Sequence, residues 1–237
     1  MNALGIILAR AGSKGLPDKC VRLLLGRPVI AYTFDYAKSA KALCGVALTT
    51  DSEPAKKLAL SAGIEVIDRP AVLASDTATV DAAARHAVET WEQRHETKVD
   101  AVALLYGNIP VRRAGLIDEA IDLLMRTGAD SVRSVAAVTK QHPDWIHRLH
   151  GDRLEQFRPN SIYRRQDLEP LYYHDGAAVV VSRRALFAAL ESPNDHQAFW
   201  GKDRRAIVVR SDDAVDIDEP VDLFLAEAIL RLRGGPA

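Results

Sequence analysis

Five residues near the start of the chain have the types and spacing needed to hold phosphate groups. They are three cations and two glycines within ten residues: Arg10, Gly12, Lys14, Gly15 and Lys19. Glycines let the backbone turn sharply and bring N–H groups close to an anion, and the cations neutralise its charge. They follow an apolar run that is typical of a buried strand in a parallel sheet. We therefore predict a phosphate-binding loop where open α/β sheets bind ligands, the alternative being a solvated surface loop.

Two known phosphate-binding motifs do not fit this loop. A Walker loop ends in Gly-Lys-Ser or Gly-Lys-Thr, and no such tail follows Gly12. A dinucleotide fingerprint has three glycines, and Arg10 stands where the first of them would be. The loop therefore favours neither a P-loop NTPase nor a dehydrogenase.

Two carboxylates near the end of the chain have the spacing of a metal site. Asp216 and Asp218 flank Ile217, and in an extended backbone alternate side chains lie on the same side. Mg²⁺ prefers a few carboxylates, with waters and substrate phosphates completing its shell. We expect both residues to bind Mg²⁺. The alternative is a helix cap, because Asp218 precedes Glu219 and Pro220 at the start of the last predicted helix.

The loop and the carboxylate pair together imply a nucleoside triphosphate held with a divalent metal. In such a site an acceptor oxygen attacks the α-phosphorus in line and pyrophosphate leaves, while the protein supplies position and charge. Arg10 and Lys19 would neutralise the phosphates, and the two aspartates would fix Mg²⁺ beside the α-phosphate and the acceptor hydroxyl. Nothing in the sequence indicates a covalent intermediate, and no residue stands out as a base for water.

The composition is that of one globular domain, residues 1–237. The chain has 48% apolar and 27% charged residues and a net charge of −1, which excludes a general electrostatic attraction to nucleic acid or an anionic membrane. No run approaches the roughly 20 apolar residues that span a bilayer. Cys20 and Cys44 are too few for a disulfide framework or a zinc site, so we expect a reducing cytoplasm.

Strand and helix patterns alternate along the chain, which predicts a doubly wound, mainly parallel, Rossmann-like α/β sheet. The expected strands are Leu4–Ala9, Gly45–Thr50, Ile64–Ile67, Asp100–Leu105, Asp130–Val138, Gly176–Ser182 and Ala206–Arg210. The expected helices are Pro28–Ala42, Glu53–Ala62, one capped by Ser75 or Asp76 that runs to about Arg94, Ala114–Thr127, Arg183–Leu190 and Glu219–Leu232. Residues 140–175 are polar, basic and aromatic without a core period, and we predict that they form an inserted arm.

The phosphate loop also follows a known family signature. It contains, in order, Ile7-Leu8-Ala9-Arg10, Ser13-Lys14-Gly15, Pro17 and Lys19. In these residues, and in the Asp-Ile-Asp before the last helix, the chain resembles the acylneuraminate (CMP-sialic acid) cytidylyltransferase family. The resemblance implies that the nucleotide is CTP and that its binding residues are Arg10, Ala11, Gly12, Ser13, Lys19, Arg69 and Ala78. Of these, Arg69 and the backbone near Ala78 would read the cytosine edge.

The same resemblance gives the arm and the acceptor site their expected roles. It implies a homodimer in which Arg165, beside Gln166 on the arm, reaches the active site of the partner. It also places Tyr106 and Asn108 at the acceptor. Four residues depart from the family pattern at positions that touch base, ribose or sugar: Cys20, Val80, Tyr106 and Trp145.

The resemblance implies transfer of CMP from CTP to the anomeric hydroxyl of a 2-keto sugar acid, with release of pyrophosphate. Because of the four departures, two alternatives stay open. One is a nucleotidyltransferase of the same fold with a different base or a different acceptor, such as a sugar phosphate or phosphonate. The other is an inactive homologue that binds nucleotide. The expected partners are CTP and a small sugar acid, with no nucleic acid and no membrane.

Overall fold

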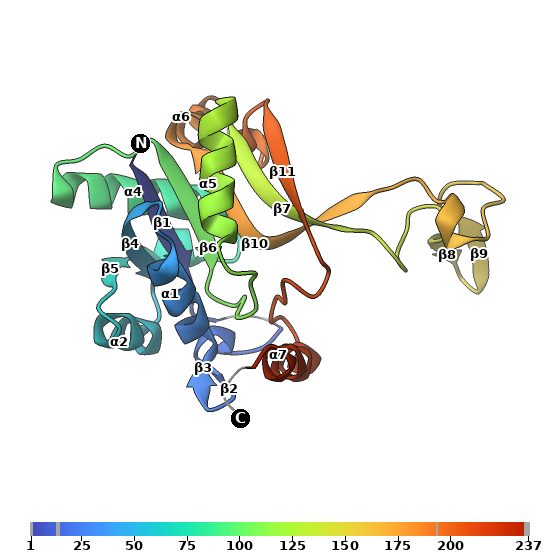
Figure 1. The fold of residues 1–237 in the computed structure, drawn as a ribbon, viewed down its shortest axis with the longest axis horizontal. Helices are drawn as coiled ribbons and strands as arrows, with labels where there is room; N and C mark the ends of the chain where they lie inside the picture. The colour runs from blue at the N-terminus through green and yellow to red at the C-terminus, as the bar shows by residue number, and fades with distance from the viewer. Residues whose placement is uncertain (1, 13–14, 193, 235–237) are drawn as a thin grey trace.

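A seven-stranded sheet forms the centre of the computed structural model, which describes residues 2–12, 15–192 and 194–234 (Figure 1). The strand order is β11-β7-β10-β6-β1-β4-β5. The strands are β1 (Ala3–Leu8), β4 (Leu43–Thr50), β5 (Glu65–Asp68), β6 (Ala101–Tyr106), β7 (Ser131–Ala137), β10 (Tyr172–Ser182) and β11 (Arg204–Val209). Neighbouring strands run parallel except where β10 pairs with β6 and β7. The predicted mainly parallel sheet, with the first strand near its centre, is confirmed.

Helices cover both faces of this sheet, which confirms the doubly wound fold. The α-helices of the described chain are α1 (Val29–Ser39), α2 (Glu53–Ser61), α3 (Ala71–Ala74), α4 (Val80–His95), α5 (Leu116–Thr127), α6 (Arg183–Ala188) and α7 (Pro220–Leu232). Alternate residues of β1 point to opposite faces. Ile7 packs in the core cluster with Phe34 of α1, and Ile6 packs in the cluster with Val88 of α4. Both faces of the central strands are therefore buried, as their continuous apolar sequence requires.

Several boundaries differ from the sequence expectation by one or more residues, and two of these differences lie near the site. Helix α4 begins at Val80, and its cap is Thr79, whose hydroxyl accepts from the N–H of Ala82, so neither Ser75 nor Asp76 caps it. Ser75 instead lies directly after the short helix α3. Strand β10 begins at Tyr172, before the expected Gly176, because residues 172–174 pair with β7 ahead of a break in register.

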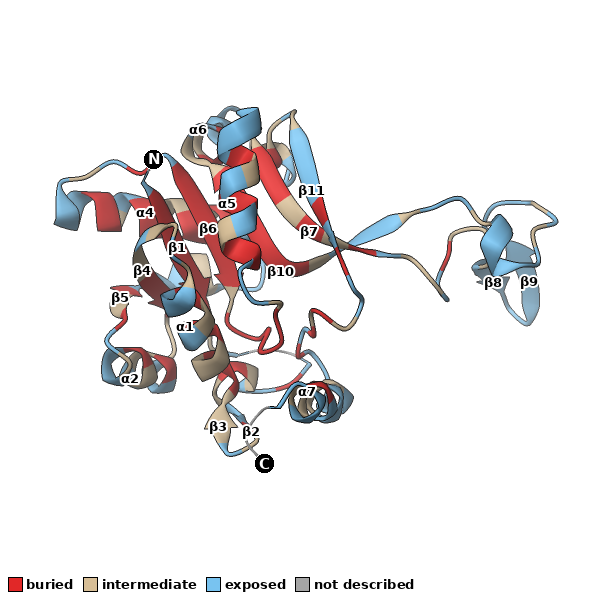
Figure 2. Cartoon of the chain, viewed as in Figure 1, coloured by how far each residue is buried: buried red, intermediate tan, exposed pale blue. Residues whose placement is uncertain are grey.

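The chain between β7 and β10, residues 138–171, leaves the sheet and projects far from it (Figure 1). It carries a hairpin of β8 (His147–His150) and β9 (Arg153–Gln156), whose residues are all exposed (Figure 2). The excursion is therefore shorter than the expected arm of residues 140–175 at its C-terminal end, where the last four residues belong to β10.

Below the sheet in Figure 1, α7 packs beside a small hairpin of β2 (Leu23–Leu24) and β3 (Arg27–Pro28). A separate apolar cluster joins α7 to the segment before it and to the first loop, through Ala226, Ile217 and Leu16. This cluster attaches the acidic segment to the phosphate loop. No helix in the described part of the chain has both the length and the apolar character needed to cross a membrane.

Candidate active site

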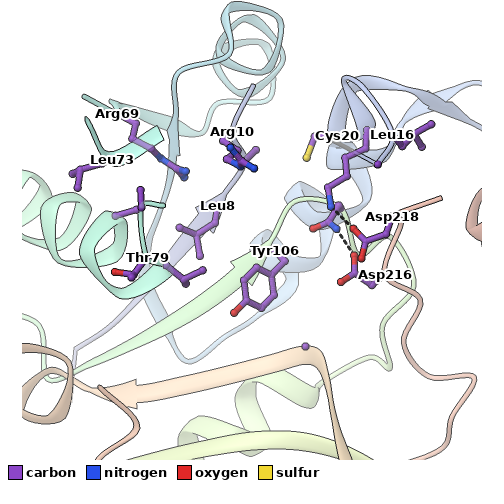
Figure 3. Close-up of a pocket in the computed structure, with 18 of the residues that line it drawn as sticks. Leu8, Arg10, Leu16, Cys20, Arg69, Leu73, Thr79, Tyr106, Asp216 and Asp218 are labelled. Atoms are coloured by element: carbon purple, nitrogen blue, oxygen red, sulfur yellow. Dashed lines mark hydrogen bonds and ion pairs between the residues drawn. The ribbon is translucent and has the colours of Figure 1, made fainter. Parts of the chain in front are cut away.

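A cavity of about 580 Å³ opens where β1 and β6 end, a size typical of small-molecule sites. Its wall includes Leu8 and Tyr106, the last residues of these two strands. Figure 3 shows Arg69, Leu73 and Thr79 on one side of the cavity, Asp216 and Asp218 on the other, and Leu8, Arg10 and Tyr106 between them. The cavity thus lies at the carboxyl edge of the parallel strands, where the sequence predicts the ligand.

We call one part of the wall the loop side: Arg10, Lys19, Arg69, Asp216 and Asp218. Two of its three cations are paired with carboxylates. Arg10 donates to Asp76 at 2.8 Å, and the Lys19 ammonium donates to Asp218 at 2.6 Å (Figure 3 shows the second pair). Most of the Lys19 side chain is shielded from solvent. A triphosphate that binds here therefore exchanges with carboxylates that already neutralise these cations.

Close backbone packing shapes the phosphate loop. Gly12 has a φ of 70°, in the left-handed region that favours glycine. A Cβ on Gly15 would lie 2.8 Å from the carbonyl oxygen of Asp218, so only glycine lets the loop approach the acidic segment this closely. The N–H of Ala11 donates to Asp51 at 2.8 Å and so already has a protein partner. Ser13, expected at the phosphates, and Lys14 lie outside the described residues.

Cys20, the residue that follows Lys19 in the sequence, also lines the cavity. Burial raises the pKa of its thiol to about 11 and outweighs the opposing effect of the Lys19 charge. The thiol is therefore protonated at neutral pH, and this side chain offers the cavity a neutral, weakly polar surface instead of a nucleophile.

Arg69 and Ala78 line the far end of the loop side. The Arg69 guanidinium is buried and donates to the carbonyl of Thr49 at 2.7 Å, which fixes its orientation, and burial lowers its pKa. The Ala78 N–H donates to the Ser75 carbonyl at 3.2 Å. Val80, one of the four departures, also lines this region and supplies an apolar surface.

Asp216 and Asp218 both face the cavity. Ile217, between them, and Val215, before them, are buried. This alternation is that of an extended segment, as the sequence predicts. The Asn108 side chain donates to the carboxylate of Asp216, and the N–H of Ile217 donates to the Asn108 carbonyl at 2.9 Å. Asn108, expected at the acceptor, therefore also holds Asp216 in place.

The charge of the carboxylate pair suits a divalent cation. Partial burial, reinforced by the charge of Asp218, raises the pKa of Asp216 to about 6. A cation between the two groups would relieve this repulsion, a role that the Lys19 ammonium fills in part here. In the described ranges, no cluster of three or more His, Cys, Asp or Glu residues could hold a metal by itself. Two carboxylates fit Mg²⁺, which takes further ligands from water and phosphate.

We call another part of the wall the β10 side: Tyr106, His174, Asp175 and Gly176. The sequence predicts only Tyr106 among these. Burial raises the pKa of Tyr106 to about 12, with a smaller effect from Asp216, so its phenol stays protonated. One Asp175 oxygen accepts from the side chain of Ser134 and the N–H of Ala177, while the other is buried without a hydrogen-bond partner.

Arg112 fixes the backbone between the two sides. It is buried below the cavity and donates to the carbonyls of Tyr106 at 2.8 Å and Ala177 at 3.0 Å. Burial lowers its pKa to about 10. One arginine thus joins the end of β6 to the start of the buried part of β10.

Arg165 and Gln166 do not join this site within one chain. They belong to a short 3₁₀ helix, η2 (Arg165–Asp167), on the projecting excursion. Neither residue lines the cavity, and the excursion projects away from the sheet (Figure 1). Trp145, the fourth departure, also lies on this excursion, where its indole donates to the carbonyl of Ile162 at 3.0 Å.

Comparison with known proteins identifies the family. A family model described as cytidylyltransferase matches residues 4–222. The chain belongs to this cytidylyltransferase family. It is 34% identical over 187 residues to the N-acylneuraminate cytidylyltransferase of Streptococcus agalactiae serotype V, an alignment that covers 77% of this chain and 44% of that protein. The N-acylneuraminate cytidylyltransferase of Escherichia coli O18:K1:H7 is 30% identical, with 97% of this chain and 52% of that protein covered.

These relatives confirm the resemblance to the acylneuraminate cytidylyltransferases, although the chain spans about half the length of both. A relative of similar length is the CMP-N,N'-diacetyllegionaminic acid synthase of Legionella pneumophila, which is 28% identical with 98% of each chain covered. Among solved structures, a CMP:2-keto-3-deoxy-manno-octonic acid synthetase complexed with CTP is similar with a TM-score of 0.74. It is 17% identical, and the match covers 98% of this chain and 100% of that one. This similarity confirms the fold.

Proposed function

We propose that this cytidylyltransferase transfers CMP from CTP to the anomeric hydroxyl of a 2-keto sugar acid and releases pyrophosphate. One observation carries the proposal: Lys19 of the phosphate loop meets Asp218 of the acidic segment at 2.6 Å, inside one cavity. The groups that we propose bind phosphate and metal, about 200 positions apart in sequence, are thus adjacent in space. The names of the relatives, which act on sialic and legionaminic acids, support the acceptor class.

In this proposal the loop side holds CTP. Arg10 and Lys19 exchange their carboxylate partners for phosphate oxygens, and the Ala11–Gly12 backbone approaches the same oxygens, together with Ser13. Arg69 and the backbone near Ala78 contact the cytosine. Each charge-assisted hydrogen bond of this kind is worth about 1.5–3 kcal/mol. Release of Lys19 from Asp218 frees that carboxylate for a cation.

Asp216 and Asp218 are the residues that would hold Mg²⁺, with Asn108 orienting the first of them. When bound, the metal supplies positive charge for the phosphates and acidifies the attacking hydroxyl. The protein's own contribution is position: the loop side fixes the α-phosphorus, and the β10 side presents the acceptor in line with it. The protonated Tyr106 phenol is available to donate a hydrogen bond to the acceptor.

We further propose that the active protein is a homodimer in which the excursion, residues 138–171, brings Arg165 and Gln166 to the cavity of the partner subunit. The support is the exposure of the excursion's apolar residues. Tyr163 is 92% exposed, and Leu149 and Leu154, which face each other across the hairpin, are 68% and 71% exposed. Apolar side chains on a projecting hairpin are typical of a surface that another chain covers.

The test is release of pyrophosphate in the presence of Mg²⁺. CTP, UTP, GTP and ATP are each combined with a panel of 2-keto sugar acids, and sugar phosphates and phosphonates serve as further acceptors. The proposal predicts release with CTP and at least one sugar acid. Release only with another triphosphate or a phosphorylated acceptor would contradict the substrates and favour the same-fold alternative. Nucleotide binding without release from any pair would favour the inactive homologue.

A further inference from the structure

Arg133 is a half-buried cation near the cavity, and no acidic residue in the described part of the chain pairs with it. It lies in the middle of β7, whose other residues are valine, alanine and serine. Its guanidinium lies over the ring of Trp200 at 4.5 Å, and within the described residues it makes no ion pair. A charge that is removed from water is costly unless it is paired or hydrogen-bonded. The stacking on Trp200 holds Arg133 in place without neutralising its charge.

The neighbours of Arg133 connect it to the β10 side. Trp200, in the 3₁₀ helix η4 (Ala198–Trp200), also contacts the ring of His174 edge-on at 6.0 Å. After burial, the charge of Arg133 is the next cause that lowers the pKa of His174, and it opposes the rise at Tyr106. Both of these residues line the cavity. Trp200 therefore links Arg133 to the cavity wall at His174, and the charge of Arg133 acts on two of the side chains that form this wall.

The charged groups near Arg133 do not neutralise it, so its guanidinium can attract an anion. The groups that act on its own pKa, besides burial, are the cation Arg204 and the phenol of Tyr106. Tyr106 is also within electrostatic reach of Asp216, at the proposed metal site. Consider a ligand whose hydroxyl lies at Asp216 and whose body extends past Tyr106. The far end of this ligand would approach the positive charge of Arg133.

We propose that Arg133 selects an acceptor that carries an anionic group, which the guanidinium binds past Tyr106 and His174. This inference rests on the proposed function, and it adds a residue that determines specificity on the β10 side. The anion is either the carboxylate of the sugar acid itself or a second acidic substituent on the same sugar. The competing explanation is that Arg133 only packs against Trp200 and has no contact with ligand.

The test compares Arg133→Gln and Arg133→Lys with the control Arg205→Gln, which removes a charge from an exposed arginine that pairs with Asp203. Two quantities are measured: KM for CTP and for the acceptor by pyrophosphate release, and Kd of the acid by calorimetry with a non-hydrolysable CTP analogue bound. Acceptors are an acid, its carboxamide, and a matched acid with a second carboxylate. Thermal unfolding shows whether each variant is folded.

We expect R133Q to weaken acid binding about tenfold to a hundredfold, the loss of one charged hydrogen bond, with the KM for CTP unchanged. R133K should recover part of the loss, and R205Q should match the wild type. If R133Q weakens binding of the acid but not of its carboxamide, the sugar acid's own carboxylate is the partner. If it weakens only the acid with the second carboxylate, the partner is the added group.

Equal acid binding by R133Q and the wild type would overturn the inference and leave the proposed function intact. An equal rise in KM for CTP and for the acceptor would also overturn it, because a structural role on Trp200 predicts that pattern. If the wild type binds the acid through Arg133 yet releases no pyrophosphate, this inference stands and the proposed function fails. The two proposals therefore fail in different measurements.

Discussion

The loop side and the β10 side of the cavity hold their positive charges in different ways. On the loop side, Arg10 and Lys19 are paired with carboxylates at 2.8 and 2.6 Å. Beside the β10 side, Arg133 lies on an aromatic ring and pairs with no acid in the described chain. A ligand on the loop side must replace existing ion pairs, whereas an anion on the β10 side meets a charge that is still free. In the proposed reaction, CTP would displace existing ion pairs on the loop side, whereas the acceptor would add to an unpaired charge beside the β10 side.

The largest expected effect is on the loop side, from removing one metal-binding charge. Asp216→Asn keeps the shape and the contact with Asn108 but halves the charge presented to Mg²⁺. We expect kcat to fall about a thousandfold, roughly 4 kcal/mol of transition-state stabilisation. Asp212→Asn, outside the cavity, is the control. The measurement is pyrophosphate release at increasing Mg²⁺ concentration, and an unchanged rate and metal dependence would show that the metal site is elsewhere.

The second prediction concerns the scaffold that joins the two sides. Glu92 of α4 is buried and bonded by Arg183, where α6 follows β10. Burial alone would raise its pKa, but hydrogen bonds from Arg183 and Lys98 outweigh burial and lower it to about 2. At neutral pH we expect Glu92→Gln to reduce the free energy of unfolding by roughly 3 kcal/mol, since each pKa unit is worth about 1.4 kcal/mol.

The pH dependence of this effect has a definite sign. The pKa of Glu92 is lower in the folded protein than in the unfolded chain, where it is near 4.5. The stabilisation is therefore complete above about pH 4.5 and is lost as the pH falls toward 2. Denaturant unfolding between pH 3 and pH 7 measures it, with the exposed Glu89→Gln as control. A difference between E92Q and wild type that does not shrink at low pH would contradict this account.

A third prediction tests whether a partner chain completes the β10 side. We expect Arg165→Ala to lower kcat/KM for the acceptor about thirtyfold, because a charged hydrogen bond contributes about 1.5–3 kcal/mol. Mixing R165A chains with D216N chains should restore activity in mixed dimers, at about a quarter of all sites for random pairing. If the mixture is no more active than the separate variants, Arg165 does not act across the dimer.

The smallest expected effect is from one hydroxyl on the β10 side. The Tyr106 phenol makes no hydrogen bond to any described residue and lines the cavity. Tyr106→Phe should raise the KM for the acceptor about fivefold, the value of one neutral hydrogen bond, and leave the KM for CTP unchanged. Steady-state kinetics with each substrate varied in turn measures both. A change confined to CTP would place Tyr106 at the nucleotide instead.

Most of the fold could be predicted from the sequence because its signals are local. The apolar strands, the proline before α1 and the helix α2 after Ser52 are read from a few neighbouring residues. The direction of β10 is not a local property. It depends on the end of the sheet from which the chain re-enters after the excursion. Likewise, Thr79 rather than Ser75 caps α4 because α3 occupies the residues before it.

The same distinction explains the site. The phosphate loop and the Asp216–Asp218 pair are contiguous motifs, so their chemistry is visible in the sequence. His174 and Asp175 stand at the beginning of a strand, where a parallel sheet would place them far from the ligand edge. Because β10 is antiparallel, its beginning lies beside the ends of β1 and β6. Arg133 is a single arginine in an apolar strand, and only its position next to Trp200 and Tyr106 indicates a role.

The most direct test of the central claim is to follow the oxygen that attacks the α-phosphorus. A 2-keto sugar acid labelled with ¹⁸O at its anomeric hydroxyl is incubated with CTP, Mg²⁺ and the protein, and the product is analysed by mass spectrometry and ³¹P NMR. We predict a CMP–sugar acid whose bridging oxygen carries the label, with unlabelled pyrophosphate as the second product. Unlabelled CMP–sugar, or CMP with labelled free sugar acid, would contradict transfer by attack of the acceptor hydroxyl.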